Sequence, residues 1–138
     1  MILDADLQFS DAQVVTATAA STNLIDMGSI RDVAVGKPMY VIVSVTTALT
    51  NTGTVTITVE SDDNSGFSSA TTQQTIGVLQ TSAAGTQLIA PLYPADNNER
   101  YMRLKYTISG TVSTGNVDAF LSDSYEYVPH YADAVVIS

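Results

Sequence analysis

Apolar and polar side chains alternate along several short stretches of this chain, and this period of two constrains the fold more than any other feature. The clearest stretch is TVTITVE at residues 54–60, where Val55, Ile57 and Val59 occupy every second position. Successive side chains of a β-strand point to opposite faces of its sheet. The pattern therefore predicts a strand that buries these three residues and turns the intervening threonines and Glu60 to water.

The stretch MYVIVSVTT at residues 39–47 alternates as well, but both of its faces are partly apolar. Its two faces carry Val41, Val43 and Val45 on one side and Tyr40, Ile42 and Ser44 on the other. Such a pattern is typical of a central strand that is covered on both sides. Because TNTGT between the two stretches has the composition of a tight connection, we expect residues 39–60 to form a hairpin.

Further strands are expected at residues 14–19, 23–28, 74–80, 86–93, 99–109 and 117–122. In the strand expected at residues 99–109, the side chains predicted to share the buried face are Met102, Leu104, Tyr106 and Ile108, and those on the opposite face are Tyr101, Arg103 and Lys105. About eight short strands at a spacing of roughly ten residues, with no helical period, favour an all-β fold. We expect a two-sheet antiparallel β-sandwich or jelly roll as one domain over residues 1–138, with an N-terminal arm (1–12) and a C-terminal arm (123–138).

The charge balance limits the partners that this chain can bind. Five Lys and Arg stand against fourteen Asp and Glu, for a formal net charge of −9. A field of that sign repels phosphate backbones and anionic lipids, so we expect neither a nucleic acid nor a membrane as partner. The most apolar stretch is interrupted by Ser44, Thr46 and Thr47, and no membrane span is predicted. The absence of cysteine excludes disulfides and fits a protein made and assembled in a cytoplasm.

The sequence SDDNSG at residues 61–66 is the one candidate for a metal site. An EF-hand loop with Gly66 in sixth place would begin at Ser61 and end at Thr72, so both anchoring carboxylates are missing. Asp62 and Asp63 could hold Ca²⁺ loosely as an alternative. We favour the interpretation that these small polar residues form a turn and that Phe67 returns the chain to the core. No metal or other cofactor is expected.

No arrangement of residues in the sequence predicts catalysis. His130 is the only histidine, and no G-x-S-x-G elbow presents a serine to it. A glycine-rich phosphate loop is also absent. We therefore expect no catalytic residue and interpret the chain as a protein without enzymatic activity.

Three of the five basic residues, Arg100, Arg103 and Lys105, lie within six positions of one another. Together with Tyr101 they could form an aromatic and basic strip of the kind that binds single-stranded nucleic acids. So few cations in so acidic a chain would bind phosphates weakly. We favour the interpretation that they pair with acidic residues, in this chain or in an acidic partner.

Several segments together resemble one family. MILDADLQFSDAQVVTATAASTNLIDMG at the start, GKPMYVIVSV, VTITVESDDNSGFSSATT and ERYMRLKYTISGT are similar to the capsid cement (decoration) proteins of tailed bacteriophages, of the small jelly-roll type found on podovirus-like heads. The resemblance covers most of the chain in the same order of segments. Residues from about His130 onward match least.

This resemblance implies a structural virion protein without enzymatic activity. Such a protein would bind the outer surface of a phage head as a small homo-oligomer, after assembly in the cytoplasm of a bacterial host. It would contact the phage major capsid protein and cement neighbouring capsomers, and so reinforce the shell against the pressure of packaged DNA. The acidic composition agrees with a place outside the shell, because packaged DNA repels an acidic protein.

The candidate contacts with these partners are apolar side chains near both ends and the basic cluster: Ile2, Leu3, Tyr125, Tyr127, Tyr131, Val135, Val136, Ile137, Arg100, Arg103 and Lys105. Two or three buried anchors contribute only about 1.5–3 kcal/mol each, so one copy would bind a shell weakly. Linking copies raises avidity, which predicts a homodimer, with a homotrimer as the alternative.

A second hypothesis is a carbohydrate- or receptor-binding β-sandwich of a phage or bacterial surface. Its groove could use aromatic side chains from Tyr93, Tyr101, Tyr125 and Tyr127. The chain has no tryptophan, the aromatic residue with the largest amphipathic face, and this argues against a sugar platform.

Overall fold

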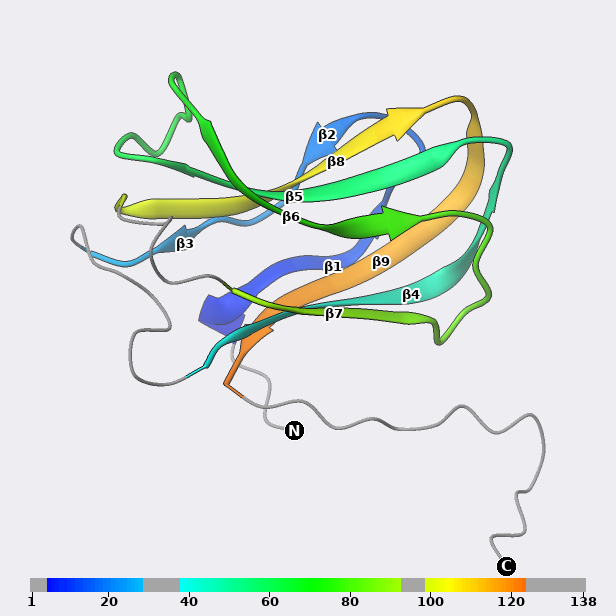
Figure 1. Cartoon of the computed structure of the whole chain (residues 1–138), viewed down its shortest axis with the longest axis horizontal. Helices are drawn as coiled ribbons and strands as arrows, with labels where there is room; N and C mark the ends of the chain where they lie inside the picture. The colour runs from blue at the N-terminus through cyan, green and yellow to red at the C-terminus, as the bar shows by residue number, and fades with distance from the viewer. Residues whose placement is uncertain (1–4, 29–37, 93–98, 124–138) are drawn as a thin grey trace, which may run out of the picture.

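The computed structural model describes residues 5–28, 38–92 and 99–123, and these form two antiparallel sheets packed face to face (Figure 1). After a short 3₁₀ turn, η1 (Ala5–Leu7), the described strands are β1 (Gln8–Val14), β2 (Ala19–Ala20), β3 (Ile25–Asp26), β4 (Tyr40–Asn51), β5 (Thr54–Asp62), β6 (Thr71–Leu79), β7 (Gln87–Pro91), β8 (Tyr101–Ser109) and β9 (Val112–Ser122). The expected all-β sandwich is confirmed.

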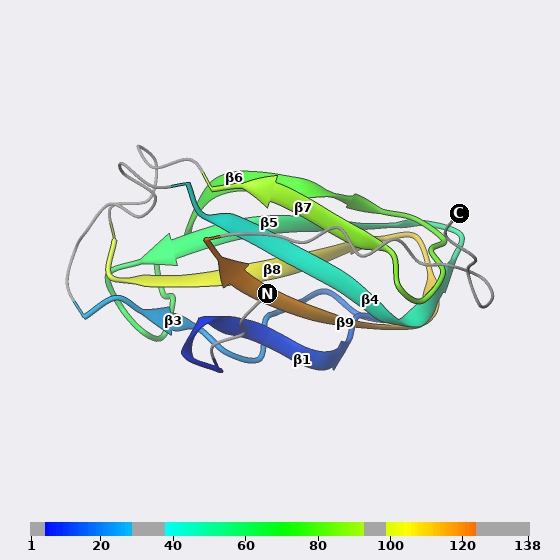
Figure 2. The same cartoon turned by 90° about the horizontal axis from the view of Figure 1, so that it is seen from below.

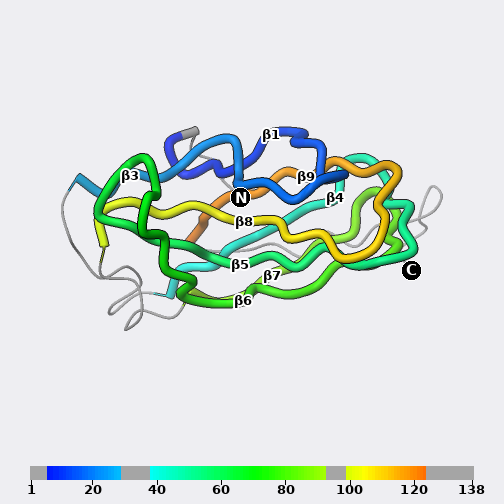
Figure 3. Tube along the Cα trace, turned by 90° about the horizontal axis from the view of Figure 1, so that it is seen from above, coloured from blue at the N-terminus to red at the C-terminus, as the bar shows by residue number. Residues whose placement is uncertain are grey.

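The order of the strands is that of a jelly roll. One sheet has the order β1-β9-β4-β7, and the other has the order β2-β8-β5-β6, with β3 also paired to β8. Strands from the two ends of the chain are therefore neighbours in both sheets. Seen from below or from above, β6 and β7 lie along one side of the sandwich, and β1 and β3 lie along the opposite side (Figures 2 and 3).

The predicted hairpin over residues 39–60 is wrong, because β4 and β5 belong to different sheets. The connection at Thr52 and Gly53 passes between the sheets beside the connection from β8 to β9. There the Thr52 amide donates a hydrogen bond of 3.0 Å to the Thr111 carbonyl. A Cβ at Gly53 would lie only 1.7 Å from the Ser109 carbonyl oxygen, so glycine is required by the close approach of the two connections. The TNTGT composition correctly indicates a turn but does not reveal that the strands separate.

The alternation seen in the sequence places the core correctly. One cluster of buried side chains joins the two sheets and includes Val41, Val43, Val45, Val55, Ile57, Val59, Met102, Leu104 and Tyr106. Ile42, on the other face of β4, is also buried, as expected for a strand with two apolar faces. Glu60 was expected to face water but is only 6% exposed, because it is covered by the basic side chains of the neighbouring strand β8.

Several boundaries need correction. The strand expected over residues 14–19 is wrong, because β1 ends at Val14 and β2 begins only at Ala19. The N-terminal arm expected over residues 1–12 enters the sheet at Gln8, since β1 pairs with β9 and buries Phe9 completely. Residues 112–116, which lie between the strands expected at 99–109 and 117–122, are the start of β9. Residues 8–12 read QFSDA and residues 112–116 read VSTGN, so neither stretch has a strong alternation of its own, and pairing with long neighbouring strands makes each of them part of a strand. Beyond Asp123, the expected C-terminal arm lies outside the described residues.

A buried hydroxyl pair ties the edge strand β1 to the opposite sheet. The Tyr106 hydroxyl of β8 and the Ser10 hydroxyl of β1 lie 2.7 Å apart. Burial raises the pKa of Tyr106 to about 12, against the lowering effect of the Ser10 hydrogen bond. The phenol therefore stays protonated at neutral pH and holds the sheets together without acting as a base.

Candidate interaction surfaces

The acidic loop after β5 is held by its own hydrogen bonds. Asp62 is completely buried, and its carboxylate accepts hydrogen bonds from the Ser69 amide (2.8 Å) and the Asn64 amide (3.0 Å). The Ser69 hydroxyl donates to the same carboxylate at 3.2 Å. Desolvation raises the pKa of Asp62, but these hydrogen bonds outweigh it and leave the pKa below its usual value. Asp62 thus closes a turn, as we favoured.

The Ca²⁺ alternative at Asp62 and Asp63 gains no further ligand from the structure. Among residues 5–28, 38–92 and 99–123, no three His, Cys, Asp or Glu side chains are grouped so as to hold a metal ion. Glu99 lies close enough for the charges of Asp62 and Asp63 to add to desolvation in raising its pKa. The charges of Asp62 and Asp63 therefore repel the ionised Glu99 carboxylate, whereas hydrogen bonds stabilise the ionised Asp62.

Phe67 anchors this loop, but not in the core. Its ring is buried and lies under the guanidinium group of Arg103, with 4.1 Å between the guanidinium carbon and the ring centroid. Arg103 also donates a hydrogen bond of 2.9 Å from Nε to Glu60 Oε2. Lys105 Nζ lies 3.8 Å from the other oxygen of Glu60. The loop is thus folded over the outer face of the sheet containing β5 and β8, which corrects the expectation that Phe67 enters the core.

The remaining cation of the basic cluster pairs with β3. Arg100 binds Asp26 through two hydrogen bonds, Nε to Oδ1 at 2.8 Å and a terminal nitrogen to Oδ2 at 3.0 Å. The Arg100 side chain and the Gly28 amide lower the pKa of Asp26. All three cations of the cluster therefore have acidic partners within this chain, one of the two possibilities left open by the sequence. We call Asp26, Glu60, Arg100, Arg103 and Lys105 the ion-paired end.

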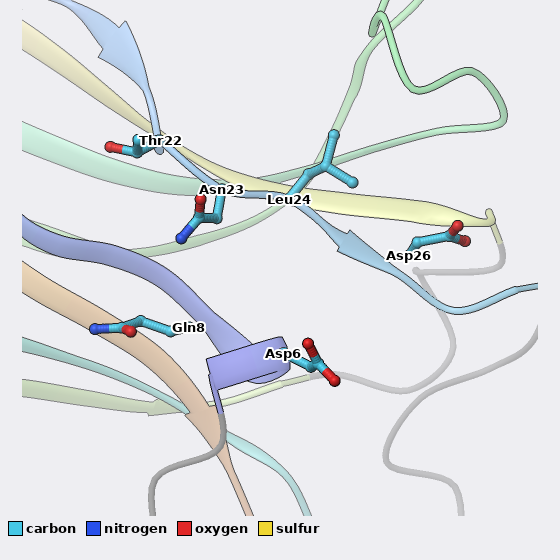
Figure 4. Close-up of a pocket in the computed structure, with 6 residues that line it drawn as sticks. All are labelled: Asp6, Gln8, Thr22, Asn23, Leu24 and Asp26. Carbon is cyan, nitrogen blue, oxygen red and sulfur yellow. The ribbon is translucent and has the colours of Figure 1, made fainter.

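An open hollow of about 610 Å³ lies between η1 with β1 and the segment that leads into β3 (Figure 4). Its lining is mostly polar and consists of Asp6, Gln8, Thr22, Asn23, Leu24 and Asp26. Since Asp26 is bound to Arg100, one wall of this hollow is fixed by the ion-paired end. The shape and the hydrogen-bonding side chains would suit a polar ligand or a partner's side chain.

The side of the sandwich formed by β6 and β7 carries no charge and lies in the longest stretch of the sequence without a charged residue. From Asn64 to Ala95 the sequence contains no Asp, Glu, Lys, Arg or His. Leu88 of β7 packs against Gly77 of β6, and the Gln74 side chain donates a hydrogen bond of 2.6 Å to the Pro91 carbonyl. These contacts close the gap between the two sheets. We call residues 71–91 the uncharged side.

Reasoning from the sequence did not predict the uncharged side or the burial of Glu60. The uncharged side could have been found, because the sequence contains a long stretch without charge. The burial of Glu60 depends on which strand lies beside β5, and local alternation does not reveal that neighbour. Of the expected partner contacts, Ile2, Leu3, Tyr125, Tyr127, Tyr131, Val135, Val136 and Ile137 lie outside the described residues. No helix in the described part of the chain is long and apolar enough to cross a membrane.

Comparison with known proteins gives a family. The model of the Bbp16 family matches residues 9–121, a range that begins in β1 and ends in β9 and so takes in both sheets. No curated protein matches the chain. Because the match covers far more than half of the sequence, the chain belongs to the Bbp16 family, a bacteriophage-related family.

Proposed function

We propose that this protein is a structural virion protein that binds the outer surface of a phage head as a homo-oligomer. There it contacts the major capsid protein and cements neighbouring capsomers against the pressure of packaged DNA. The observation that carries this proposal is membership of a phage-related family over both sheets of the sandwich. The similarity of several sequence segments to jelly-roll cement proteins supports the more specific role.

The charge distribution supports a place outside the shell. The chain has a net charge of −9, and Arg100, Arg103 and Lys105 are each bound to an acidic side chain of the same chain. These cations are therefore poorly placed to bind phosphates. An acidic surface is repelled by packaged DNA and tolerated on the exterior. We propose neither a nucleic acid nor a membrane as partner, and no catalytic activity.

The construction of the sandwich supports a role in reinforcement. Two sheets share one apolar core, and the Ser10–Tyr106 hydroxyl pair ties an edge strand across it. Such a body can transmit load between two contacts without changing shape. Weak contacts to the shell gain strength when copies are joined, so a homodimer, or alternatively a homotrimer, is the proposed form.

The reinforcement is tested with DNA-filled heads of the same phage that lack this protein. Heads are heated with and without added protein, and the release of DNA is followed with a dye that fluoresces on binding it. Saturating protein should raise the temperature of release, whereas an unrelated acidic protein of similar size should not. An unchanged release temperature at saturation would contradict cementing.

The polar hollow beside Asp26 favours one second candidate, a module that binds a carbohydrate or a receptor. This hypothesis predicts that the isolated protein binds a glycan in a glycan screen. Replacing both Thr22 and Asn23 by Ala should abolish that binding, because both line the hollow. A chain that binds heads and no glycan would exclude it.

A further inference from the structure

The two sides of the sandwich are protected to different degrees against pairing with another strand. On one side, β1 carries Asp11 and has two register shifts in its pairing with β9, and β2 and β3 have only two residues each. Charges, irregularities and short length are the usual devices that prevent an edge strand from pairing with another chain. The side formed by β1, β2 and β3 is therefore protected against pairing with a strand of another chain.

On the other side, the same devices protect β7 but not β6. Strand β7 has five residues and ends at Pro91. Strand β6 has nine residues, TTQQTIGVL, with no proline and no charge, and within the described chain its only strand partner is β5. Two register shifts interrupt the pairing with β5, but they add neither a charge nor a proline to the other edge of β6.

The surface next to this edge is apolar and hydroxyl-bearing. Val78 is 49% exposed, and Thr71, Thr72 and Thr75 are exposed along the same strand. Large apolar side chains are otherwise well covered in the described residues, the other exposed ones being Val14 and Leu24. Val78 thus gives β6 an apolar contact that a partner strand could bury.

The net charge of the chain indicates which partner can bind at the edge of β6. Two copies of a chain with a net charge of −9 repel each other wherever acidic surfaces meet. Several parts of the described surface carry no charge, and the uncharged side is the one among them that also has a long strand edge, so two copies can approach there without that repulsion. A partner chosen by charge attraction would instead need basic groups facing acids, and β6 offers none.

We propose that β6 is the homodimer contact: two copies pair their β6 strands antiparallel across a two-fold axis and join their β2-β8-β5-β6 sheets into one continuous sheet. Such a contact is self-complementary, since each copy contributes the same strand. This inference rests on the homo-oligomer of the proposed function and adds the surface that joins the copies.

The first test compares two exposed valines on opposite sides of the sandwich. Val78→Asp places a charge on β6, and Val14→Asp places the same charge on β1, where the side chain is 56% exposed. Sedimentation velocity of the full chain should show a dimer for the wild type and for Val14→Asp. Val78→Asp should be monomeric, with a dissociation constant raised at least about 100-fold, because each copy would bring an unpaired charge into the shared strand contact. A dimeric Val78→Asp would overturn the proposal.

A second test uses the absence of cysteine. Single cysteines are introduced at Thr72, Thr75 and Val78 in separate variants, with Thr22→Cys as the control on the opposite side. Under mild oxidation, at least one β6 variant should form a disulfide-linked dimer at low protein concentration, and the control should not. No crosslink at any of the three β6 positions would contradict the antiparallel pairing.

These outcomes are separate from the outcome for the proposed function. If the wild-type chain is dimeric through β6 but does not bind heads, the proposed function is refuted and the proposed interface stands. If the wild-type chain is monomeric in solution, the proposed interface is refuted. If its binding to heads were still lost in Val78→Asp, β6 would instead be a contact with the shell protein.

Discussion

The ion-paired end and the uncharged side present opposite kinds of surface on one sandwich. At the ion-paired end, Arg100 is bound by Asp26, and Arg103 and Lys105 share Glu60, so the charged groups satisfy one another. On the uncharged side, β6 carries no charged side chain, and among the described strands it pairs only with β5. The charged residues of this acidic chain thus hold its own fold, whereas in the dimer that we propose the contact is made by neutral residues.

The largest effect is expected at Glu60. Replacing it by Ala removes the acid shared by two cations and leaves Arg103 half-buried over Phe67 without its carboxylate. Breaking a buried pair costs about 3–5 kcal/mol, and partial exposure of the cations reduces this to about 3 kcal/mol. Urea unfolding of Glu60→Ala measures the loss.

The matched control for Glu60→Ala lies on the uncharged side. Thr75→Ala changes an exposed side chain of β6 and should alter the free energy of unfolding of the monomer by less than about 0.5 kcal/mol. Equal losses for the two variants would show that the ion pairs do not hold the fold.

A second difference concerns pH, since the uncharged side has no group that titrates. Asp62 has a lowered pKa, so its contribution to stability is present above its usual value of 3.8 and is lost as the pH falls below it. Glu99 has a raised pKa, so ionising it weakens the fold as the pH rises above 4.5. Glu99→Gln should therefore raise the melting temperature at pH 7 and leave it nearly unchanged at pH 3.

Asp62→Asn should act in the opposite direction. It removes a carboxylate that accepts hydrogen bonds from Asn64 and Ser69, so the melting temperature at pH 7 should fall and its drop on acidification should become smaller. It should also bring the pKa of Glu99 closer to its usual value, because Asp62 contributes to raising it. Carboxyl titration by NMR checks this coupling, and an unchanged Glu99 would refute it.

A smaller loss of stability is expected at the contact between β6 and β7 on the uncharged side. A Cβ at Gly77 would come within 2.8 Å of a terminal methyl group of Leu88. That methyl group lies at the end of a flexible side chain, so Gly77→Ala should cost only about 1 kcal/mol as Leu88 shifts. Thermal unfolding measures it. A loss as large as that of Glu60→Ala would mean that the uncharged side is the more tightly packed region.

The smallest expected effect is that of salt on the exposed pair. Arg100 and Asp26 are both substantially exposed, so screening by 1 M NaCl should weaken their pairing while β6 contacts remain. The dimer should persist or tighten as repulsion between the acidic copies is screened. Sedimentation at 50 mM and 1 M NaCl compares the two. Dissociation at high salt would place the dimer contact on charged residues instead.

Most of the core could be predicted from the sequence, because alternation depends only on the strand's own geometry. Val55, Ile57 and Val59 are buried as that geometry requires. The separation of β4 from β5 could not be predicted, since turn composition at Gly53 is the same whether or not the strands pair. The burial of Glu60 and the place of Phe67 under Arg103 depend on β8, which is distant in sequence.

The most direct measurement is co-sedimentation of the tag-free protein with undecorated heads of its own phage, both unexpanded and expanded. Binding should saturate on expanded heads, with copies added in steps of a whole oligomer, and Val14→Asp should bind as the wild type does. Folded protein that stays in the supernatant with both kinds of head would contradict the proposal that this chain cements a phage shell.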